Sequence, residues 1–262
     1  TSLAMTSTSV IDNLTLASLT VTVNASFTGT DINLGNAPAD VMNFGTLTVN
    51  GTSANVSENS ATSVTGANVV AGGFTLTSAG AIDTDPVFPA VLAVTSGTAG
   101  SLSWTAGGTI TDGAGTTFAV AGLASFNAGA NAVTLGDTGL DVTNFGSLGL
   151  VGTTATVTED SSMVLAAVNV TNLVVTATTN PADTITDSGT VIVTGTLTAT
   201  ASAGVVLNST TNDAGTINLF TGTGGATFTD ATSFTVGTIT AAVGVVLTSL
   251  GGSIFSDGVG VD

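Results

Sequence analysis

Apolar and hydroxyl side chains alternate along most of this chain, and no other feature constrains the fold as strongly. The alternation is clear in residues 19–23, 46–49 and 74–77. A period of two puts successive side chains on opposite faces of a β-strand, and the abundant threonine and valine are β-branched residues that favour strands. Gly, Asn, Asp and Ser interrupt the pattern at short intervals, as turns do. The sequence therefore predicts an all-β protein.

The chain also repeats itself at an offset of 101 residues. The stretch VMNFGTLTVNGTSANVSEN (41–59) returns as VTNFGSLGLVGTTATVTED (142–160), and a weaker copy, DAGTINLFTGTGGATFTD, follows at 213–230. The recurring structural positions are Phe44, Phe145 and Phe220, the glycines Gly51 and Gly152, and the acids Glu58, Glu159 and Asp230. We expect the three phenylalanines to stack in the core and the three acids to be solvated turn residues.

A second marker is an isoleucine followed closely by an aspartate. It occurs at Ile82, Ile110, Ile185 and Ile254, where the first interval is short and the next two are long and nearly equal. These intervals predict a single elongated domain over residues 1–262, built of three units at about 10–82, 110–185 and 185–257. An inserted coil at about 83–110 would separate the first two units.

Two architectures fit these repeats. The favoured one is a right-handed parallel β-helix, a solenoid of about twelve coils with ~20 to 25 residues in each, since solenoids stack short repeats and tolerate a whole inserted coil. The alternative is a row of tandem Ig-like β-sandwiches of roughly 100 residues. Sandwiches would explain the offset of 101 residues but not the shorter intervals of the isoleucine marker.

The charge composition excludes several classes of function. The chain has no Lys, Arg, His or Cys, and its 17 acidic residues give a formal net charge of −17. Nucleic-acid binding through phosphate contacts and docking of basic patches on anionic membranes are therefore excluded, and no apolar run is long enough for membrane insertion. Triads that need His, Lys or Cys cannot form. We predict a protein that is not an enzyme and has no cofactor.

The remaining site candidates are carboxylates. We expect the aspartate after each isoleucine marker to close a turn by accepting backbone N–H groups. Calcium is the weaker alternative, because it takes several oxygen ligands. The candidate ligands are Asp83, Asp85, Asp183 and Asp187. Two of the recurring acids could form a glycosidase pair only if they lay close together, and their places in separate units argue against that.

The insert and the threonines leave two further possibilities open. The insert holds Phe88 and the only tryptophan, Trp104, which is either a core residue or a contact residue. In the second case the chain would be an adhesin stalk that binds carbohydrate or another surface. The Thr-x-Thr pairs resemble those of ice-binding solenoids, but their register drifts along the chain, so we interpret threonine as a solvent-facing strand former.

Residues 185–219, ITDSGTVIVTGTLTATASAGVVLNSTTNDAGTINL, resemble the degenerate repeats of filamentous-haemagglutinin-like bacterial surface proteins, and residues 110–150 have the same cadence. The resemblance implies a right-handed parallel β-helix in a long secreted adhesin or fibre. From this and the composition we expect an extracellular structural protein at the cell surface. It would be a subunit or segment of a filament or fibrous adhesin, with other copies of itself as end-to-end partners and surface glycans as a further ligand.

Overall fold

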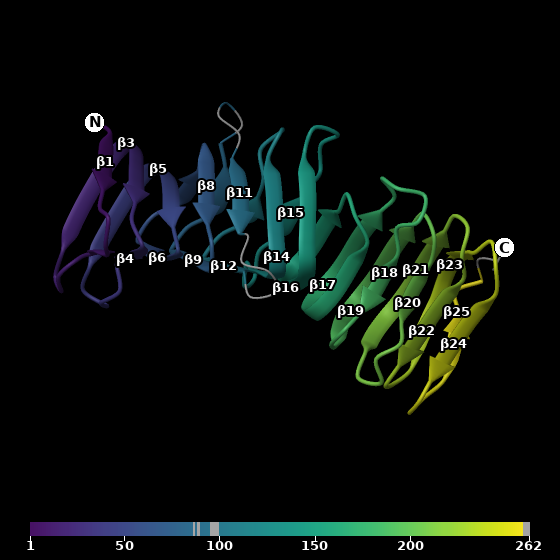
Figure 1. Cartoon of the computed structure of the whole chain (residues 1–262). Coiled ribbons are helices and arrows are strands. Elements are labelled where there is room, and N and C mark those ends of the chain that lie inside the picture. Colours follow the sequence, from purple (N-terminus) through teal and green to yellow (C-terminus); the bar gives the residue numbers. More distant parts are fainter. Residues whose placement is uncertain (86, 88–89, 95–99, 259–262) are drawn as a thin grey trace. The chain divides into compact units, whose positions relative to one another are not determined.

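The computed structural model describes residues 1–85, 87, 90–94 and 100–258, and the regular structure of these residues is β-strand without any helix. The strand pairings of the described residues are parallel, for example β6 with β9 and β18 with β20. The strands stack as a β-solenoid of about 11 turns, which confirms the predicted all-β solenoid (Figure 1). Tandem Ig-like sandwiches are excluded, because their sheets are antiparallel.

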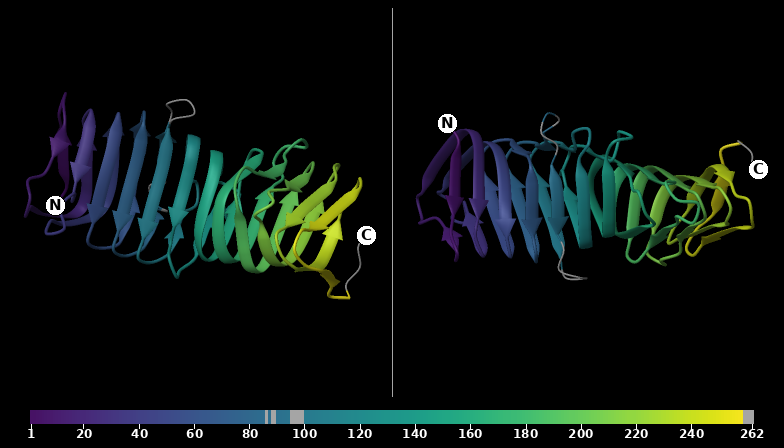
Figure 2. Two further views of the ribbon diagram at one scale, coloured as in Figure 1. Left: turned by 90° about the horizontal axis from the view of Figure 1, so that it is seen from below. Right: turned by 45° about the horizontal axis from the view of Figure 1, so that its top comes forward.

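The chain divides into two compact units, and the first spans Thr1–Asn144. Its strands are β1 Leu3–Thr6, β2 Ile11–Asp12, β3 Ser18–Thr28, β4 Asp31–Leu34, β5 Val41–Gly51, β6 Ser53–Glu58, β7 Thr62–Val64, β8 Ala67–Val70, β9 Gly73–Ser78, β10 Ile82–Thr84, β11 Val91–Val94, β12 Ser101–Ala106, β13 Ile110–Thr111, β14 Thr117–Asn127 and β15 Val133–Leu135. One ladder joins β7, β10, β13 and β15, and a second joins β4, β6, β9, β12 and the end of β14 (Figure 2).

The second unit spans Phe145–Asp262. Its strands are β17 Met163–Ala177, β18 Ile185–Asp187, β19 Val191–Ala201, β20 Val205–Leu207, β21 Asp213–Thr221, β22 Ala226–Asp230, β23 Phe234–Thr240, β24 Val245–Ser249 and β25 Ile254–Ser256, while β16 Val142–Thr158 crosses the boundary between the units. One ladder joins β18, β20, β22 and β24, and another joins β17, β19, β21, β23 and β25.

The alternating sequence becomes an alternation of burial. In β12 and β14 every second side chain is buried, so most of the large apolar residues fill the interior, while threonine, serine, alanine and Leu123 face outward. Equivalent inward positions of successive turns pair in register and form stacks. Ile82 pairs with Ile110 across a single turn, and Ala54 pairs with Phe74 across a turn that contains fewer residues. The buried stacks form the core of each unit.

The tryptophan of the expected insert is a core residue. Trp104 is fully buried and makes edge-to-face contacts with Phe74, Phe118 and Phe126, at ring-centroid distances of 6.4, 5.7 and 5.8 Å. Such geometry is favourable for aromatic pairs. The prediction of Trp104 as a contact residue is therefore wrong. A binding surface on the expected insert could not use the tryptophan side chain. Phe88, the other contact candidate, lies outside the described residues.

Of the three phenylalanines expected in the core, two are buried and one is not. Phe44 and Phe145 are buried. Among the marker isoleucines, those at 82, 110 and 185 are buried, whereas Ile254 in the last turn is 44 % exposed. Phe220 is only half-buried, because it lies between the inward residues Leu219 and Thr221 and thus on the outer face of β21. In the third copy the backbone position equivalent to Phe44 is the buried Ala214, as the contacts of the recurring acids establish below.

Candidate functional site

The three recurring acids are buried, contrary to the prediction of solvated turns. Glu58, Glu159 and Asp230 are 4, 0 and 0 % exposed. Each accepts a hydrogen bond from a backbone N–H that lies 14 to 16 residues earlier: Phe44 N donates to Glu58 at 2.7 Å, Phe145 N to Glu159 at 2.9 Å and Ala214 N to Asp230 at 2.8 Å. The carboxylates take the place of ladder carbonyls where the strand pairing is interrupted.

A hydroxyl two residues further on supports each acid. Ser60 donates to Glu58 at 2.9 Å, Ser161 donates to Glu159 at 3.1 Å, and both the backbone and the hydroxyl of Thr232 donate to Asp230. The sequence motif is therefore an acid followed by any residue and then Ser or Thr. This short motif, together with the offset of 101 residues, is the signal by which the burial of the acids could have been anticipated.

The first two copies differ at one contact. In the first, the Thr62 hydroxyl donates to Oε2 of Glu58 at 2.5 Å. The position 101 residues later is Met163, and Oε2 of Glu159 is buried without a hydrogen-bond partner among the described residues. Burial raises the pKa of Glu58, and it raises the pKa of Glu159 to about 7. The missing hydroxyl adds to the effect of burial at Glu159, because hydrogen bonds to a carboxylate favour its charged form, and the neighbouring carboxylates of Asp183 and Asp160 raise the pKa further.

The separate contacts of these acids argue against a glycosidase pair, as do their places in separate repeats. Each is bound to a different strand, Glu58 to β5, Glu159 to β16 and Asp230 to β21. A retaining or inverting glycosidase needs two carboxyl groups that face one bond.

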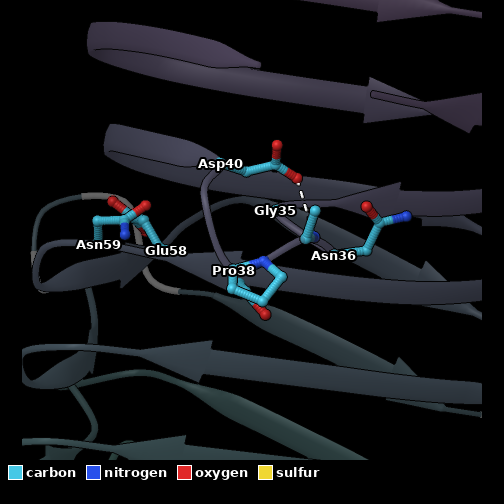
Figure 3. Close-up of a pocket in the computed structure, with 8 residues that line it drawn as sticks. Gly35, Asn36, Pro38, Asp40, Glu58 and Asn59 are labelled. Atoms are coloured by element: carbon cyan, nitrogen blue, oxygen red, sulfur yellow. Dashed lines mark hydrogen bonds between the residues drawn. The ribbon is translucent and has the colours of Figure 1, made fainter. Parts of the chain in front are cut away.

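A pocket of about 330 Å³ lies beside Glu58 and is lined by Gly35, Asn36, Ala37, Pro38, Asp40, Ser57, Glu58 and Asn59 (Figure 3). Its polar groups are already engaged in the fold. Asn59 accepts the Met42 N–H at 2.7 Å, and Asp40 accepts the Ala37 N–H at 2.9 Å. The side chains that line the pocket therefore stabilise the turn between β4 and β5 and the start of β5 through hydrogen bonds to the backbone.

A second recurring feature lies at this turn. It is a hydrogen-bonded pair of polar side chains from successive turns of the solenoid, which we call a corner. Asn13 donates from Nδ2 to Asp40 at 2.7 Å, and its Oδ1 accepts the Gly35 N–H at 2.7 Å. In unit 2 the order is reversed, since Asn212 donates from Nδ2 to Asp187 at 2.6 Å. The hydrogen bonds to Asn13 and Ala37 contribute to a lowered pKa of Asp40, with the Ala37 N–H the larger cause.

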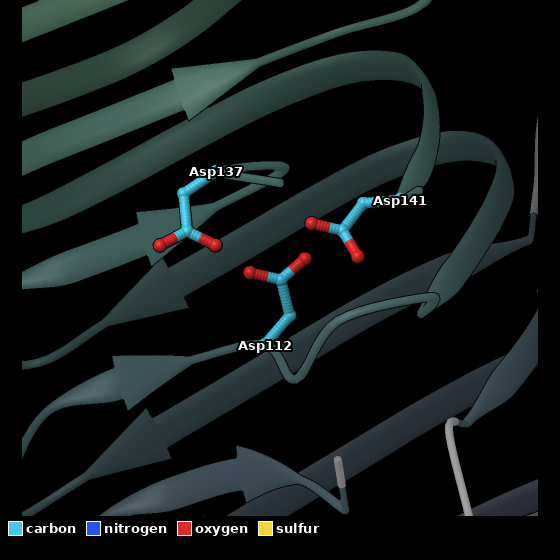
Figure 4. A group of neighbouring side chains, drawn as sticks. All are labelled: Asp112, Asp137 and Asp141. Atoms are coloured by element: carbon cyan, nitrogen blue, oxygen red, sulfur yellow. The ribbon is translucent and has the colours of Figure 1, made fainter. Parts of the chain in front are cut away.

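A third corner of this kind contains only carboxylates. Asp112 accepts the Gly136 N–H at 2.9 Å, and Asp141 accepts the Gly115 N–H at 2.7 Å. One oxygen each from Asp112, Asp137 and Asp141 lie within 4.8 Å of one another (Figure 4). Burial, with a smaller contribution from the two neighbouring carboxylates, raises the pKa of Asp112 to about 7. Three carboxylates are few for calcium, which takes six to eight oxygens.

The four calcium candidates serve other purposes or stand apart. Asp187 accepts the backbone N–H groups of residues 208 and 209, so it holds a turn of the next coil and not the nearby turn that the sequence predicted. Asp183 accepts the Asn180 N–H at 2.7 Å, and Asp85 accepts the Val87 N–H at 2.7 Å. Asp83 has a buried Oδ1 for which the described part of the chain offers no donor. Among the described residues, none of the four belongs to a group of three ligating side chains.

The comparison with protein families decides what kind of repeat this is. A family model described as repeats of unknown function (DUF5649) matches residues 87–149 and 152–221, about half of the chain. The chain belongs to this family. The first DUF5649 segment contains Trp104 with two of its three aromatic partners and the Asp112 corner, and the second contains Glu159 and the Asp187 corner. No curated protein and no solved structure matches the chain. Within the described residues, no helix is long and apolar enough to cross a membrane.

Proposed function

We propose that the chain is a structural segment of an extracellular surface filament or fibrous adhesin, and that further solenoid turns dock on its terminal turns. The observation that supports this most strongly is the exposure of inward-facing apolar residues in those turns. A solenoid buries its core only by stacking turns, so an uncovered terminal turn needs a cap or another turn.

Within the described residues, the last turn of unit 2 leaves inward-facing side chains exposed. Ile254 stacks on the fully buried Phe234, yet 44 % of its own surface is exposed. Leu247 occupies the same kind of position over the buried Phe228 and is itself only half-buried. Strands β24 and β25 pair with the preceding turn, and no strand follows them among the described residues.

The first turn of unit 1 has the same character. Met5 in β1 stacks on the fully buried Phe27 and remains 41 % exposed. Natural proteins protect such open strand edges with lysine, proline or a covering element. The chain has no lysine, and β1 and β2 contain no proline. A turn of another copy, or of the same polypeptide, is the occupant that fits a parallel edge with an apolar interior.

The extracellular part of the proposal rests on composition and resemblance. Charged residues make up 6 % of the chain, hydroxyl residues coat its strands, and the cadence resembles that of filamentous-haemagglutinin-like fibres. A chain without lysine and arginine also offers no cleavage site to trypsin-like proteases, which suits a durable surface material.

Light scattering over a range of protein concentrations, with electron micrographs, tests the assembly. We expect the average mass of the wild-type chain to rise with concentration. Ile254→Asp and Met5→Asp should each abolish the rise, because each charges one uncovered core. An equimolar mixture of the two variants should form dimers and stop there, since one open end remains on each. Phe255→Asp, an exposed outward neighbour, is the control and should assemble. A wild-type chain that stays monomeric at high concentration would refute the proposal.

A further inference from the structure

The corner that links successive turns occurs in three forms, and comparison of the three identifies what one of them lacks. Asn13 and Asp40 form the first, Asp187 and Asn212 the second. In both, one partner is an amide whose N–H donates to the other partner's carboxylate. The amide supplies the hydrogen, and the pair carries a single negative charge.

Asp112 and Asp141 hold the same places in the third corner. Asp112 accepts the Gly136 N–H as Asn13 accepts the Gly35 N–H. Asp141 accepts the Thr138 N–H as Asp40 accepts the Ala37 N–H. No amide hydrogen is available from either aspartate of this pair.

One oxygen of Asp112 is left without a donor. Its Oδ1 is buried and has no hydrogen-bond partner within the described residues. The Asp112 carboxyl group points toward the other two carboxylates of the cluster (Figure 4). The corner therefore lacks the hydrogen that an amide supplies in the other two.

The groups around Asp112 also favour its protonated form. The titratable groups that face it are Asp137 and Asp141, both on the following turn. The preceding turn presents the Thr84 hydroxyl, which accepts the Gly113 N–H at 2.7 Å. The sequence has no basic side chain that could neutralise the cluster. Like charges in contact disfavour simultaneous ionisation, and the raised pKa of Asp112 agrees with this geometry.

We propose that this corner is a pH-sensitive link between turns: Asp112 carries a proton and donates it to Asp141, in place of the amide hydrogens of Asn13 and Asn212. Loss of the proton as the pH rises leaves two ionised carboxylates where the other two corners hold one. The corner then opens locally, and the backbone N–H groups bound to the two aspartates lose protection.

Hydrogen exchange of the Gly115, Gly136 and Thr138 amides between pH 5 and pH 9, in the presence of a chelator, tests the proposal. After correction for intrinsic exchange, we expect protection in the wild type to fall by up to about tenfold per pH unit as the pH rises toward the raised pKa of Asp112, and to level off above it, because the open corner releases its proton at a lower pH than the closed one. Asp112→Asn recreates the Asn13 pair and should abolish the fall. Asp141→Asn recreates the pair of an aspartate with Asn212 and should abolish the fall as well. With two independent variants, misfolding of one of them does not leave the proposal untested.

The reverse variant makes the test independent of this corner. Asn13→Asp places a second carboxylate beside Asp40. Protection of the Gly35 amide should then become pH-dependent, while the pH dependence of Gly136 protection stays as in the wild type. Equal protection at all pH values in the wild type would overturn the proposal. So would protection that millimolar calcium restores at pH 8 and a chelator removes, because the link would then be an ion and not a proton.

Discussion

Glu58 and Glu159 are the only glutamates in the chain, and they occupy equivalent positions that differ by one hydroxyl. Thr62 donates to Oε2 of Glu58, and Met163 stands in its place beside Glu159. We predict that Thr62→Val converts the first site into the second. The substitution keeps the shape of the side chain and removes the donor, and Thr62 is almost fully buried, so water does not replace it.

The magnitude follows from the second site. Burial raises the pKa of Glu159 from an ordinary value of 4.5 to about 7. At ~1.4 kcal/mol per pKa unit this corresponds to an upper limit of ~3.5 kcal/mol, reduced by residual solvent screening. Because the folded-state pKa is raised, this stability is fully present below pH 4.5, is lost as the pH rises through 7, and stays lost above it. The buried, unpaired Oε2 atom of Glu159 therefore lowers the stability of the fold most in alkaline solution, where the carboxylate is charged.

For Thr62→Val we expect the same behaviour at Glu58. Its pKa, already raised by burial, should rise further toward that of Glu159. A hydrogen bond to a charged group contributes about 1.5–3 kcal/mol. The variant should therefore lose about that much stability at pH 8, and much less at pH 4, where Glu58 is protonated in both proteins.

Selective ¹³C labelling of the glutamate carboxyl groups gives a spectrum with two signals, and a pH titration reads both pKa values at once. In the wild type we expect one signal to titrate near pH 7 and the other below it. In Thr62→Val the lower one should move up while the Glu159 signal stays. Thr75→Val, an exposed strand position, is the control and should move neither. If both glutamates titrate near 4.5 in the wild type, the assignment of a structural role to buried, hydrogen-bonded glutamates is wrong.

Three further predictions concern the core and the corners, each measured by urea unfolding. Trp104→Ala should lose ~3–5 kcal/mol through the cavity it leaves among three aromatic rings, and Trp104→Phe far less. Gly35→Ala should destabilise strongly, because its φ is +69° and a Cβ would lie 2.1 Å from a backbone oxygen, whereas Gly129→Ala pays only for its φ of +56° in open space. Phe220→Ser should cost less than ~1.5 kcal/mol and Phe44→Ser ~3 kcal/mol or more, since only Phe44 is buried; equal losses would contradict the observed register.

The fold class could be predicted from the sequence because a solenoid depends on local patterns. The period of two in residues 117–127 corresponds directly to the buried and exposed faces of β14. The short marker interval between Ile82 and Ile110 is one turn, as their pairing demonstrates. Both signals depend on nothing more than alternation and the length of a coil, so a single sequence suffices to detect them.

The site was less predictable, because it depends on contacts between turns. Glu58 and Glu159 were recognised as equivalent, but their burial follows from an unpaired N–H on a strand 14 residues earlier. The Asp112 corner was missed for a related reason. Asp40 and Asp141 share the offset of the main repeat, whereas their partners Asn13 and Asp112 are slightly closer together in sequence, so a fixed offset does not align both halves of the pair.

Phe220 illustrates the same limit. The third copy has slipped relative to the first two, so an alignment by residue type placed a phenylalanine where the backbone places Ala214. A period of two assigns a side chain to the inner or outer face of a strand only once the register is known. A shift of one residue moves every side chain to the opposite face.

A chain without cationic side chains must hold its buried carboxylates by other means, and burial together with the donors around each carboxylate gives the direction of its pKa shift. Asp40 accepts two backbone N–H groups and one amide N–H, and its pKa is lowered. Glu58 has one N–H and two hydroxyls, and burial raises its pKa. Glu159 has two donors and Asp112 one, and the pKa of each is raised to about 7. Where the turns supply too few donors, as at Glu159 and Asp112, a proton can take the place of the missing hydrogen-bond donor, so the contacts of these two acids should depend on pH.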